Sequence, residues 1–352
     1  MAGMHRTAKT GLLLINLGTP ESPSAADVRP YLREFLMDPR VIDLPTWKRW
    51  LIVRMILIRR PAASGEAYEK IWTEQGSPLL VHSRALTEKV ARRLGDVPVE
   101  LGMRYGNPSI PSAMQRLRAA GVDKLVVFPL YPQYSSAANG SSLDKVYTEA
   151  AKLWNVPDIE TIPPFYDDPG FIKACAERAR PVIDRANPEK VYFSFHGLPE
   201  RHVVKSDTSG SHCLRSADCC SAIGEANRHC YRAQCYATAR LLAEKLEIPE
   251  EKRVVCFQSR LGRDPWIPPY TDHLLIEHAR AGIKRAVILS PAFVADCLET
   301  LEELGIRALA DWKANGGERL DLVPCINDDD VWVDALLDIV RRNSSAAAGI
   351  SV

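Results

Sequence analysis

Short apolar runs alternate with amphipathic segments of about 10 to 15 residues through most of the chain. The apolar runs are rich in Val, Ile, Leu and Phe, which is typical of strands buried on both faces of a parallel sheet. Strands are predicted at Gly11–Asn16, Val99–Arg104, Lys124–Leu130, Lys190–Phe195, Arg253–Gln258 and Arg285–Leu289. Helices are predicted at Ala25–Phe35, Ser83–Leu94, Ser109–Ala120, Tyr236–Leu246, Tyr270–Ala281 and Val331–Asn343. This alternation predicts an α/β protein with parallel sheets covered by helices on both faces.

The same order of elements occurs twice. In each half a strand leads through a proline-containing loop to a helix, a glycine and a second strand that ends in proline. We interpret the chain as two similar doubly wound, Rossmann-like domains, residues 1–166 and 167–343, with a boundary near Pro164–Gly170. Residues 344–352 are predicted to be a disordered tail. Ligands of such sheets bind at the carboxyl ends of the strands, so we expect the chemistry in a cleft between the domains.

Composition narrows the classes of partner and compartment. The 352 residues are 46% hydrophobic and 25% charged, with a formal net charge of +1, so no global field points to nucleic acid. The basic start Met1–Thr10 and the short apolar run after it do not resemble a secretory signal. No stretch reaches the roughly 20 apolar residues of a membrane-spanning helix. We expect a cytoplasmic protein, either soluble or peripherally membrane-associated, as a monomer or homodimer.

One histidine follows a predicted strand directly. His196-Gly197-Leu198-Pro199 comes after Lys190–Phe195, at the edge where the cleft is expected. A histidine held there can accept protons near neutral pH. The alternative is a histidine that only caps a turn.

Two carboxylates, Asp296 and Glu299, follow the last predicted strand and lie three residues apart. This spacing suits a capping box, in which both residues satisfy backbone groups at the start of a helix. In the alternative interpretation both carboxylates face the cleft, opposite His196.

Three further loops could bind a flat ligand with polar edges. Arg104 and Tyr105 close the second predicted strand, and an arginine there could bind a carboxylate in bidentate fashion. Tyr134 and Ser135 follow the third strand, and Trp266 lies in the loop after Gln258–Gly262 in the second half. Each loop alone could equally be an ordinary surface loop.

Taken together, these segments resemble the ferrochelatase family over roughly Gly11–Arg342. The segments that match, in the family's order, are Leu14–Pro20, Gly76–Leu79, Met103–Tyr105, Tyr131–Ser135, Ser194–Pro199, Gln258–Arg260 with Pro265–Trp266, and Asp296–Leu301. The resemblance implies two Rossmann-like domains with a porphyrin cleft between them. It also implies insertion of ferrous iron into protoporphyrin IX to form protohaem, the last step of haem biosynthesis.

The resemblance also implies roles for individual residues. His196 and Glu299 would be the principal catalytic residues and would contact the substrate Fe²⁺, with Asp296 as a further carboxylate. The residues expected to contact the porphyrin are Leu17, Tyr68, Ser77, Arg104, Tyr105, Tyr134, Ser135 and Trp266. Cys297 stands where many family members have histidine, and we expect it to be an inert helix residue.

The chemistry of metal insertion suits these residue types. A neutral imidazole can accept the pyrrole protons that leave as the metal enters, and carboxylates suit iron delivery or onward proton transfer. The alternatives are a porphyrin- or haem-binding protein without catalysis, and a chelatase that uses coproporphyrin III or another divalent metal.

Five cysteines crowd into 23 residues of a segment at about 205–235. Four thiolates can bind a [2Fe–2S] cluster or one Zn²⁺, and a thiol-rich loop without metal is a third interpretation. Certain bacterial ferrochelatases keep all four cluster ligands inside this segment, so the resemblance favours the cluster. We expect its ligands to be Cys213, Cys220, Cys230 and Cys235, with Cys219 as the alternative to Cys220.

The segment of about residues 35–60 is basic and apolar. Its part Trp47–Arg60 is predicted to be amphipathic and could lie in a membrane interface or pack on the porphyrin domain. The resemblance favours an apolar lip at the mouth of the cleft.

Overall fold

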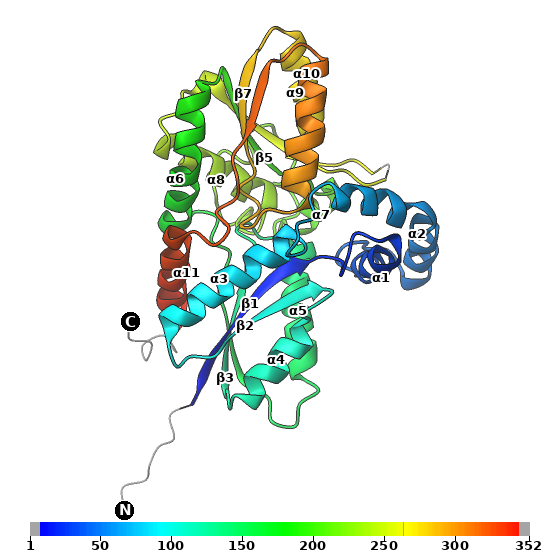
Figure 1. The fold of residues 1–352 in the computed structure, drawn as a ribbon, viewed down its shortest axis with the longest axis vertical. Coiled ribbons are helices and arrows are strands. Elements are labelled where there is room, and N and C mark those ends of the chain that lie inside the picture. The colour runs from blue at the N-terminus through cyan, green and yellow to red at the C-terminus, as the bar shows by residue number, and fades with distance from the viewer. Residues whose placement is uncertain (1–7, 263, 345–352) are drawn as a thin grey trace, which may run out of the picture.

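Two four-stranded parallel sheets form the framework of the chain (Figure 1). The structure is a computed structural model that describes residues 8–262 and 264–344. The first sheet has the order β2-β1-β3-β4 and the second has the order β6-β5-β7-β8. Their bounds are β1 Thr10–Gly18, β2 Val99–Tyr105, β3 Lys124–Pro129, β4 Asp158–Thr161, β5 Lys190–His196, β6 Arg253–Gln258, β7 Arg285–Leu289 and β8 Arg319–Leu322. The predicted α/β class and its two similar sheets are confirmed.

All of the predicted strands are confirmed, but the edge strands β4 and β8 were missed. Each of these has only four residues, and most of them are half-buried. An edge strand that is covered on one side has no continuous apolar run. The hydrophobic pattern that identified the central strands is therefore absent from it.

Helices cover both faces of the first sheet. Leu12 and Leu14 of β1 belong to one buried cluster, whereas Leu13 and Ile15 belong to another. Successive residues of a strand point to opposite faces, so each face of the sheet has its own core.

The helices are α1 Ala25–Leu36, α2 Thr46–Glu69, α3 Pro78–Leu94, α4 Ile110–Ala119, α5 Ser141–Ala150, α6 Pro169–Ala186, α7 Glu200–Lys205, α8 Tyr231–Lys245, α9 Thr271–Arg280, α10 Leu309–Ala314 and α11 Asp330–Asn343.

Two helices begin earlier than predicted. Helix α3 starts at Pro78, whose fixed φ suits the first turn of a helix, instead of at Ser83. Helix α8 starts at Tyr231 instead of at Tyr236, so its first turn lies inside the cysteine-rich segment. The sequence prediction omitted α6, which contains Pro181. A proline inside a segment usually marks the end of a helix, so the pattern around Pro181 does not predict a continuous helix.

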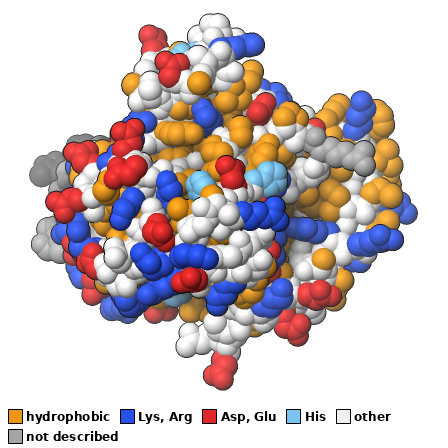
Figure 2. Space-filling view, turned by 90° about the horizontal axis from the view of Figure 1, so that it is seen from above, with side chains coloured by type: hydrophobic (Ala, Val, Ile, Leu, Met, Phe, Trp, Pro, Cys, Tyr) orange, Lys and Arg blue, Asp and Glu red, His pale blue; other side chains and the backbone are white. Residues whose placement is uncertain are grey.

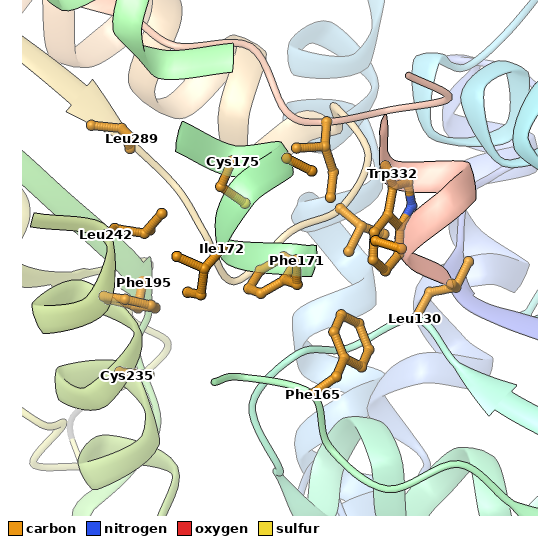
Figure 3. Packing of buried hydrophobic residues seen from close by; sticks show 14 of the residues in the cluster. Leu130, Phe165, Phe171, Ile172, Cys175, Phe195, Cys235, Leu242, Leu289 and Trp332 are labelled. Carbon is orange, nitrogen blue, oxygen red and sulfur yellow. The ribbon is translucent and has the colours of Figure 1, made fainter. Parts of the chain in front are cut away.

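One buried core connects the two halves of the chain. It contains residues of both sheets, and Phe165, Phe171 and Trp332 pack together at its centre (Figure 3). Helix α11, at the end of the described chain, packs on both α6 and α3. The predicted division at 166/167 stays a prediction, and this core extends across it. The predicted tail, apart from Ser344, lies outside the described residues.

Each half has a π-helix after the third strand of its sheet. The segment η1 Ser136–Gly140 follows β3, and η3 Glu299–Ala308 follows β7. A short 3₁₀ turn, η2 Glu250–Lys252, precedes β6. π-helical turns are rare and are often found at functional sites, so these two direct attention to this end of both sheets.

Helices α1 and α2 form a lobe that projects from the rest of the molecule (Figure 1). They pack through Leu36, Ile42, Val53 and Leu57. No helix of the described ranges, 8–262 and 264–344, is long and apolar enough to cross a membrane.

Candidate active site

A cavity with about 1020 Å³ of empty space, its open mouth included, lies where the carboxyl ends of the strands meet. Its walls come from the ends of β1 and β5, the loops after β3 and β7, helices α1, α2, α3 and α8, and both π-helices. Most of its lining is apolar, as in sites for small organic ligands. The predicted site residues that line it are Leu17, Tyr68, Ser77, Ser135, His196 and Glu299.

His196 is the last residue of β5, which pairs with β6 and β7 at the centre of its sheet. Its Nδ1 lies 2.6 Å from the carbonyl oxygen of Gly197. A carbonyl can only accept, so Nδ1 carries a hydrogen, and Nε2 is the nitrogen that can take up a proton. The rings of Phe293 and Trp266 lie 6.3 and 6.4 Å from the imidazole, between centroids.

Glycine at position 197 lets the chain after His196 pass close to the end of β6. A Cβ there would lie 3.0 Å from the carbonyl oxygens of both Gln258 and Ser259, and 3.2 Å from the Trp266 ring. Because neither backbone oxygen can move without disturbing β6, a larger residue would displace the histidine.

Glu299 is the first residue of π-helix η3 and lines the same cavity. Burial raises the pKa of the Tyr31 and Tyr68 hydroxyls, and the nearby charge of Glu299 raises it further. Both hydroxyls therefore stay protonated beside the carboxylate. Tyr31 donates to the carbonyl oxygen of Gly18 at 3.2 Å, and Tyr68 hydrogen-bonds to Tyr31 and Thr19.

Cys297 lies in the loop before η3 and lines the cavity, so its expected place in a helix was wrong, whereas its expected inertness stays a prediction. Burial raises the pKa of its thiol, and a hydrogen bond to Glu299 raises it further. The protonated thiol is thus a neighbour of the carboxylate.

Sequence reasoning missed Glu303, which lies four residues after Glu299 on the same π-helix. Its carboxylate accepts from the Ser259 backbone N at 2.9 Å and from the Ser259 hydroxyl at 2.5 Å. Burial raises the pKa of Glu303, while the Ser259 hydrogen bond and the nearby His196 oppose that rise. The four-residue spacing from Glu299 was the signal in the sequence that could have found it.

The structure does not bring Asp296 to the cavity. It is 5% exposed, and its carboxylate accepts from Asn327 Nδ2 at 2.8 Å and Thr300 Oγ1 at 3.1 Å. The backbone N of Cys325 also donates to it at 3.2 Å. These bonds fix the loop that carries Glu299 against the segment around residue 325. The helix itself is preceded by Leu298, so Asp296 is not its cap either.

Arg104 and Tyr105 also lie outside the cavity lining. Asp38 Oδ2 accepts from Arg104 Nη2 at 2.5 Å and from the Tyr105 hydroxyl at 2.9 Å, and Ser141 Oγ accepts from Arg104 Nε at 2.6 Å. Burial and the charge of Asp38 raise the pKa of Tyr105. The arginine that seemed suited to a ligand carboxylate is already paired with a carboxylate of the protein, far away in the sequence.

Tyr134 and Trp266 are near the cavity but do not line it. The Tyr134 ring lies 5.8 Å from His229, and its backbone N donates to Gln234 Oε1 at 2.6 Å. The indole N–H of Trp266 donates to the carbonyl oxygen of Leu261 at 3.0 Å, and its ring flanks His196.

All five cysteines of the insert are buried. The Cys230 thiol hydrogen-bonds to Cys213 and to Cys220, and Cys219 Sγ lies 3.8 Å from Cys220 Sγ. Within the described part of the chain, no group of three or more His, Cys, Asp or Glu side chains is arranged to hold a metal ion. The thiols of the insert thus lie close together.

The lobe carries an exposed apolar surface on α2. Trp47, Met55 and Ile58 are 63, 68 and 61% exposed. Figure 2 shows hydrophobic and basic side chains gathered on this projecting lobe. The opposite face of α2 packs on α1, so the predicted amphipathic segment is a helix that covers α1 and leaves an apolar face uncovered.

Comparison with known proteins gives one consistent result. A family model described as Ferrochelatase matches residues 9–344. A protein named ferrochelatase from Pseudomonas fluorescens strain SBW25 is 47% identical over 340 residues, covering 95% of this chain and 98% of its own length. A ferrochelatase from Coxiella burnetii strain Dugway 5J108-111 is 46% identical over 337 residues, covering 95% and 94%.

Solved structures agree on the fold. SirB from Bacillus subtilis, determined with Fe³⁺, superposes with a TM-score of 0.55 at 15% identity, covering 97% of this chain and 98% of its own. The sirohydrochlorin chelatase SirB of Bacillus subtilis subspecies spizizenii, in complex with cobalt, gives a TM-score of 0.55 at 12% identity, with 97% of both chains covered. At these identities the likeness shows the fold alone.

Proposed function

The chain belongs to the ferrochelatase family, and we propose that His196 accepts the pyrrole protons of the porphyrin while Glu299 receives the ferrous iron. The protein is a metal chelatase that inserts ferrous iron into a porphyrin for haem synthesis, as its relatives named ferrochelatase are. A porphyrin-binding protein without catalysis is therefore not the right description. The observation that carries the residue roles is one cavity lined by both side chains.

Metal insertion exchanges two pyrrole protons for a dication, so a base and a metal-binding group must reach the same macrocycle. The Gly197 carbonyl holds the His196 ring with Nε2 as its basic atom. Glu299 supplies a hard oxygen ligand that suits Fe²⁺, and the protonated hydroxyls of Tyr31 and Tyr68 are its neutral neighbours. Substitutions at His196 and Glu299 have the largest expected effects on metal insertion.

The lining favours protoporphyrin IX as the porphyrin. Among the described residues that line the cavity there is no lysine or arginine, and many are apolar, such as Leu17, Phe35 and Leu298. Coproporphyrin III carries more carboxylates than protoporphyrin IX, and each buried carboxylate needs a partner. The less charged macrocycle therefore suits this cavity better.

For the insert we propose a [2Fe–2S] cluster held by Cys213, Cys220, Cys230 and Cys235. The support is a buried polar atom without a partner: Arg232 Nε, on a side chain whose Nη1 lies 3.2 Å from Cys220 Sγ. Thiolates and sulfide are acceptors for such a donor, and the guanidinium offsets the negative charge of a cluster. Cys220 is favoured over Cys219 because it contacts both Cys230 and Arg232. When bound, such a group supplies one-electron redox chemistry.

Protein purified without oxygen should therefore contain about two iron atoms and two sulfides per chain, with absorption bands between roughly 300 and 600 nm that dithionite bleaches. Cys230→Ser should remove most of this signal because a ligand is lost. Cys175→Ser, which changes a buried cysteine of α6 outside the insert, is the matched control and should retain it. One zinc per chain and a featureless spectrum would replace the cluster with a zinc site.

We also propose that the exposed face of α2 lies on a membrane surface. The stretch 46–60 contains Lys48, Arg49, Arg54, Arg59 and Arg60 and no acidic residue. A groove between α1 and α2 is lined by Arg29, Arg33 and Arg54 beside Trp50. Apolar side chains flanked by cations are typical of a helix in the interface of an anionic bilayer.

Trp47→Asp should weaken binding to phosphatidylcholine vesicles that contain phosphatidylglycerol by about tenfold, because it replaces inserted apolar surface with a repelled charge. Cosedimentation measures this directly. Trp154→Asp is the matched control, since Trp154 is 97% exposed but lies outside the lobe. Equal vesicle binding by both variants would contradict the proposal.

A further inference from the structure

We propose that the first two turns of α8 couple the cysteine insert to the porphyrin cavity, so that cluster-loaded protein binds porphyrin more tightly than cluster-free protein. The inference rests on the proposed cluster. It assigns to Tyr231 the role of a positioning residue shared by the two sites, a role that metal insertion itself does not require.

One side of α8 belongs to the cavity. Tyr231 is part of the cavity lining and is 6% exposed. Gln234 Oε1 accepts from the Tyr134 backbone N at 2.6 Å, and Thr238 Oγ1 accepts from Gln133 Nε2 at 3.0 Å. The wall segment that contains Gln133 and Ser135 is therefore bonded to α8 at successive turns.

The start of α8 also contacts the cysteines of the insert. Cys230 precedes the helix as its N-terminal cap residue, and Cys235 is fully buried one turn later. Arg232 reaches from the same turn to the sulfur of Cys220. The hydroxyl of Tyr231 hydrogen-bonds to the thiol of Cys235, so one side chain touches both the cavity and an expected cluster ligand.

The cysteine insert has less regular hydrogen-bonded structure than the rest of the fold, so a metal group that links its cysteines would add more to its order. Between α7 and α8 the described chain contains neither helix nor strand. Polar side chains hold its loops. Among them, Asp207 accepts from the backbone N of His212 and Cys213, and Asn227 donates to the carbonyl oxygen of Cys219. Without a metal group, hydrogen bonds and side-chain packing hold the start of α8, and it can loosen at lower cost than when a cluster links Cys230 and Cys235 to the insert.

Loosening this turn would disturb the cavity wall through Tyr231 and Gln234. Porphyrin, in turn, orders the wall and would hold the turn in place. Because coupling free energies are reciprocal, a cluster that favours the ordered turn must favour porphyrin binding by the same factor. The insert would thus make substrate binding depend on whether the cluster is present.

The test compares porphyrin affinity with and without the cluster. Dissociation constants for protoporphyrin IX, without added metal, are measured by fluorescence on anaerobically purified protein and on the same protein after its cluster is removed with a chelator. We expect about five- to tenfold weaker binding after removal. In Tyr231→Phe, which lacks only the shared hydroxyl, the ratio of the two constants should approach one.

Tyr236→Phe is the matched control, because Tyr236 contacts Arg232, which lies beside the cysteines, but Tyr236 does not line the cavity. It should keep the wild-type ratio, and thermal unfolding checks that all forms are folded. Absence of iron and sulfide in the purified protein would overturn the proposed cluster and this inference with it. Equal porphyrin affinities in loaded and cluster-free wild type, or an unchanged ratio in Tyr231→Phe, would overturn the coupling alone.

Discussion

His196→Ala should reduce the kcat of metal insertion by about a hundredfold to ten-thousandfold while porphyrin still binds. The substitution removes the basic nitrogen that the Gly197 carbonyl holds toward the cavity. The apolar walls that hold the macrocycle are left intact. Initial rates are followed by the loss of porphyrin fluorescence as ferrous iron enters under anaerobic conditions, and affinity is measured by the same signal without metal.

His273→Ala is the control for this variant, because His273 lies on α9 with a side chain that is 65% exposed. It should insert metal at the wild-type rate. Wild-type turnover in His196→Ala would remove His196 from the mechanism. If porphyrin binding were lost together with turnover, His196 would be a residue that binds the substrate rather than one that accepts its protons.

Glu299→Gln should slow metal insertion by about a hundredfold and raise the KM for ferrous iron. The amide keeps the size of the side chain and can still accept a hydrogen bond, but it loses the charge that attracts a dication. Steady-state kinetics with iron as the varied substrate separates the two effects. Porphyrin affinity should change little, because the apolar lining supplies most of the contact with the macrocycle.

Glu318→Gln provides a matched control, since Glu318 is a well-exposed carboxylate beside β8 and far from the cavity lining. The proposal expects no change there. An unchanged KM for iron in Glu299→Gln, with only kcat reduced, would make Glu299 a proton-transfer residue. Unchanged kinetics in both constants would contradict its place in the mechanism.

The central strands and the residues that follow them could be predicted from the sequence. A parallel strand buried on both faces must be a continuous apolar run, so the pattern locates it without knowledge of the partners. Leu17, Ser135 and His196 line one cavity because each lies at or near the carboxyl end of a central strand. Local sequence determines such positions.

The partners of polar side chains could not be predicted in the same way. Arg104 follows the pattern of a ligand-binding arginine, yet its guanidinium donates to the carboxylate of Asp38, 66 residues away in the sequence. Asp296 has the spacing of a helix cap, yet its carboxylate accepts hydrogen bonds from the Asn327 side chain and the Cys325 backbone N. A charged group pairs with whatever the fold places within a few ångströms, and no local rule predicts that neighbour.

The sequence by itself determined the α/β class, the repeated order of elements and several residues of the cavity, among them Leu17, His196 and Glu299. Only the tertiary structure decided which of the candidate residues reach the cavity and that Glu303 lies near both His196 and Glu299. It also decided that α8 begins inside the cysteine insert and forms part of the cavity wall. The physical reason is the distance along the chain over which each interaction acts. Hydrophobic periodicity acts between near neighbours in the chain, whereas cavities and buried polar pairs are made by segments that meet only after folding.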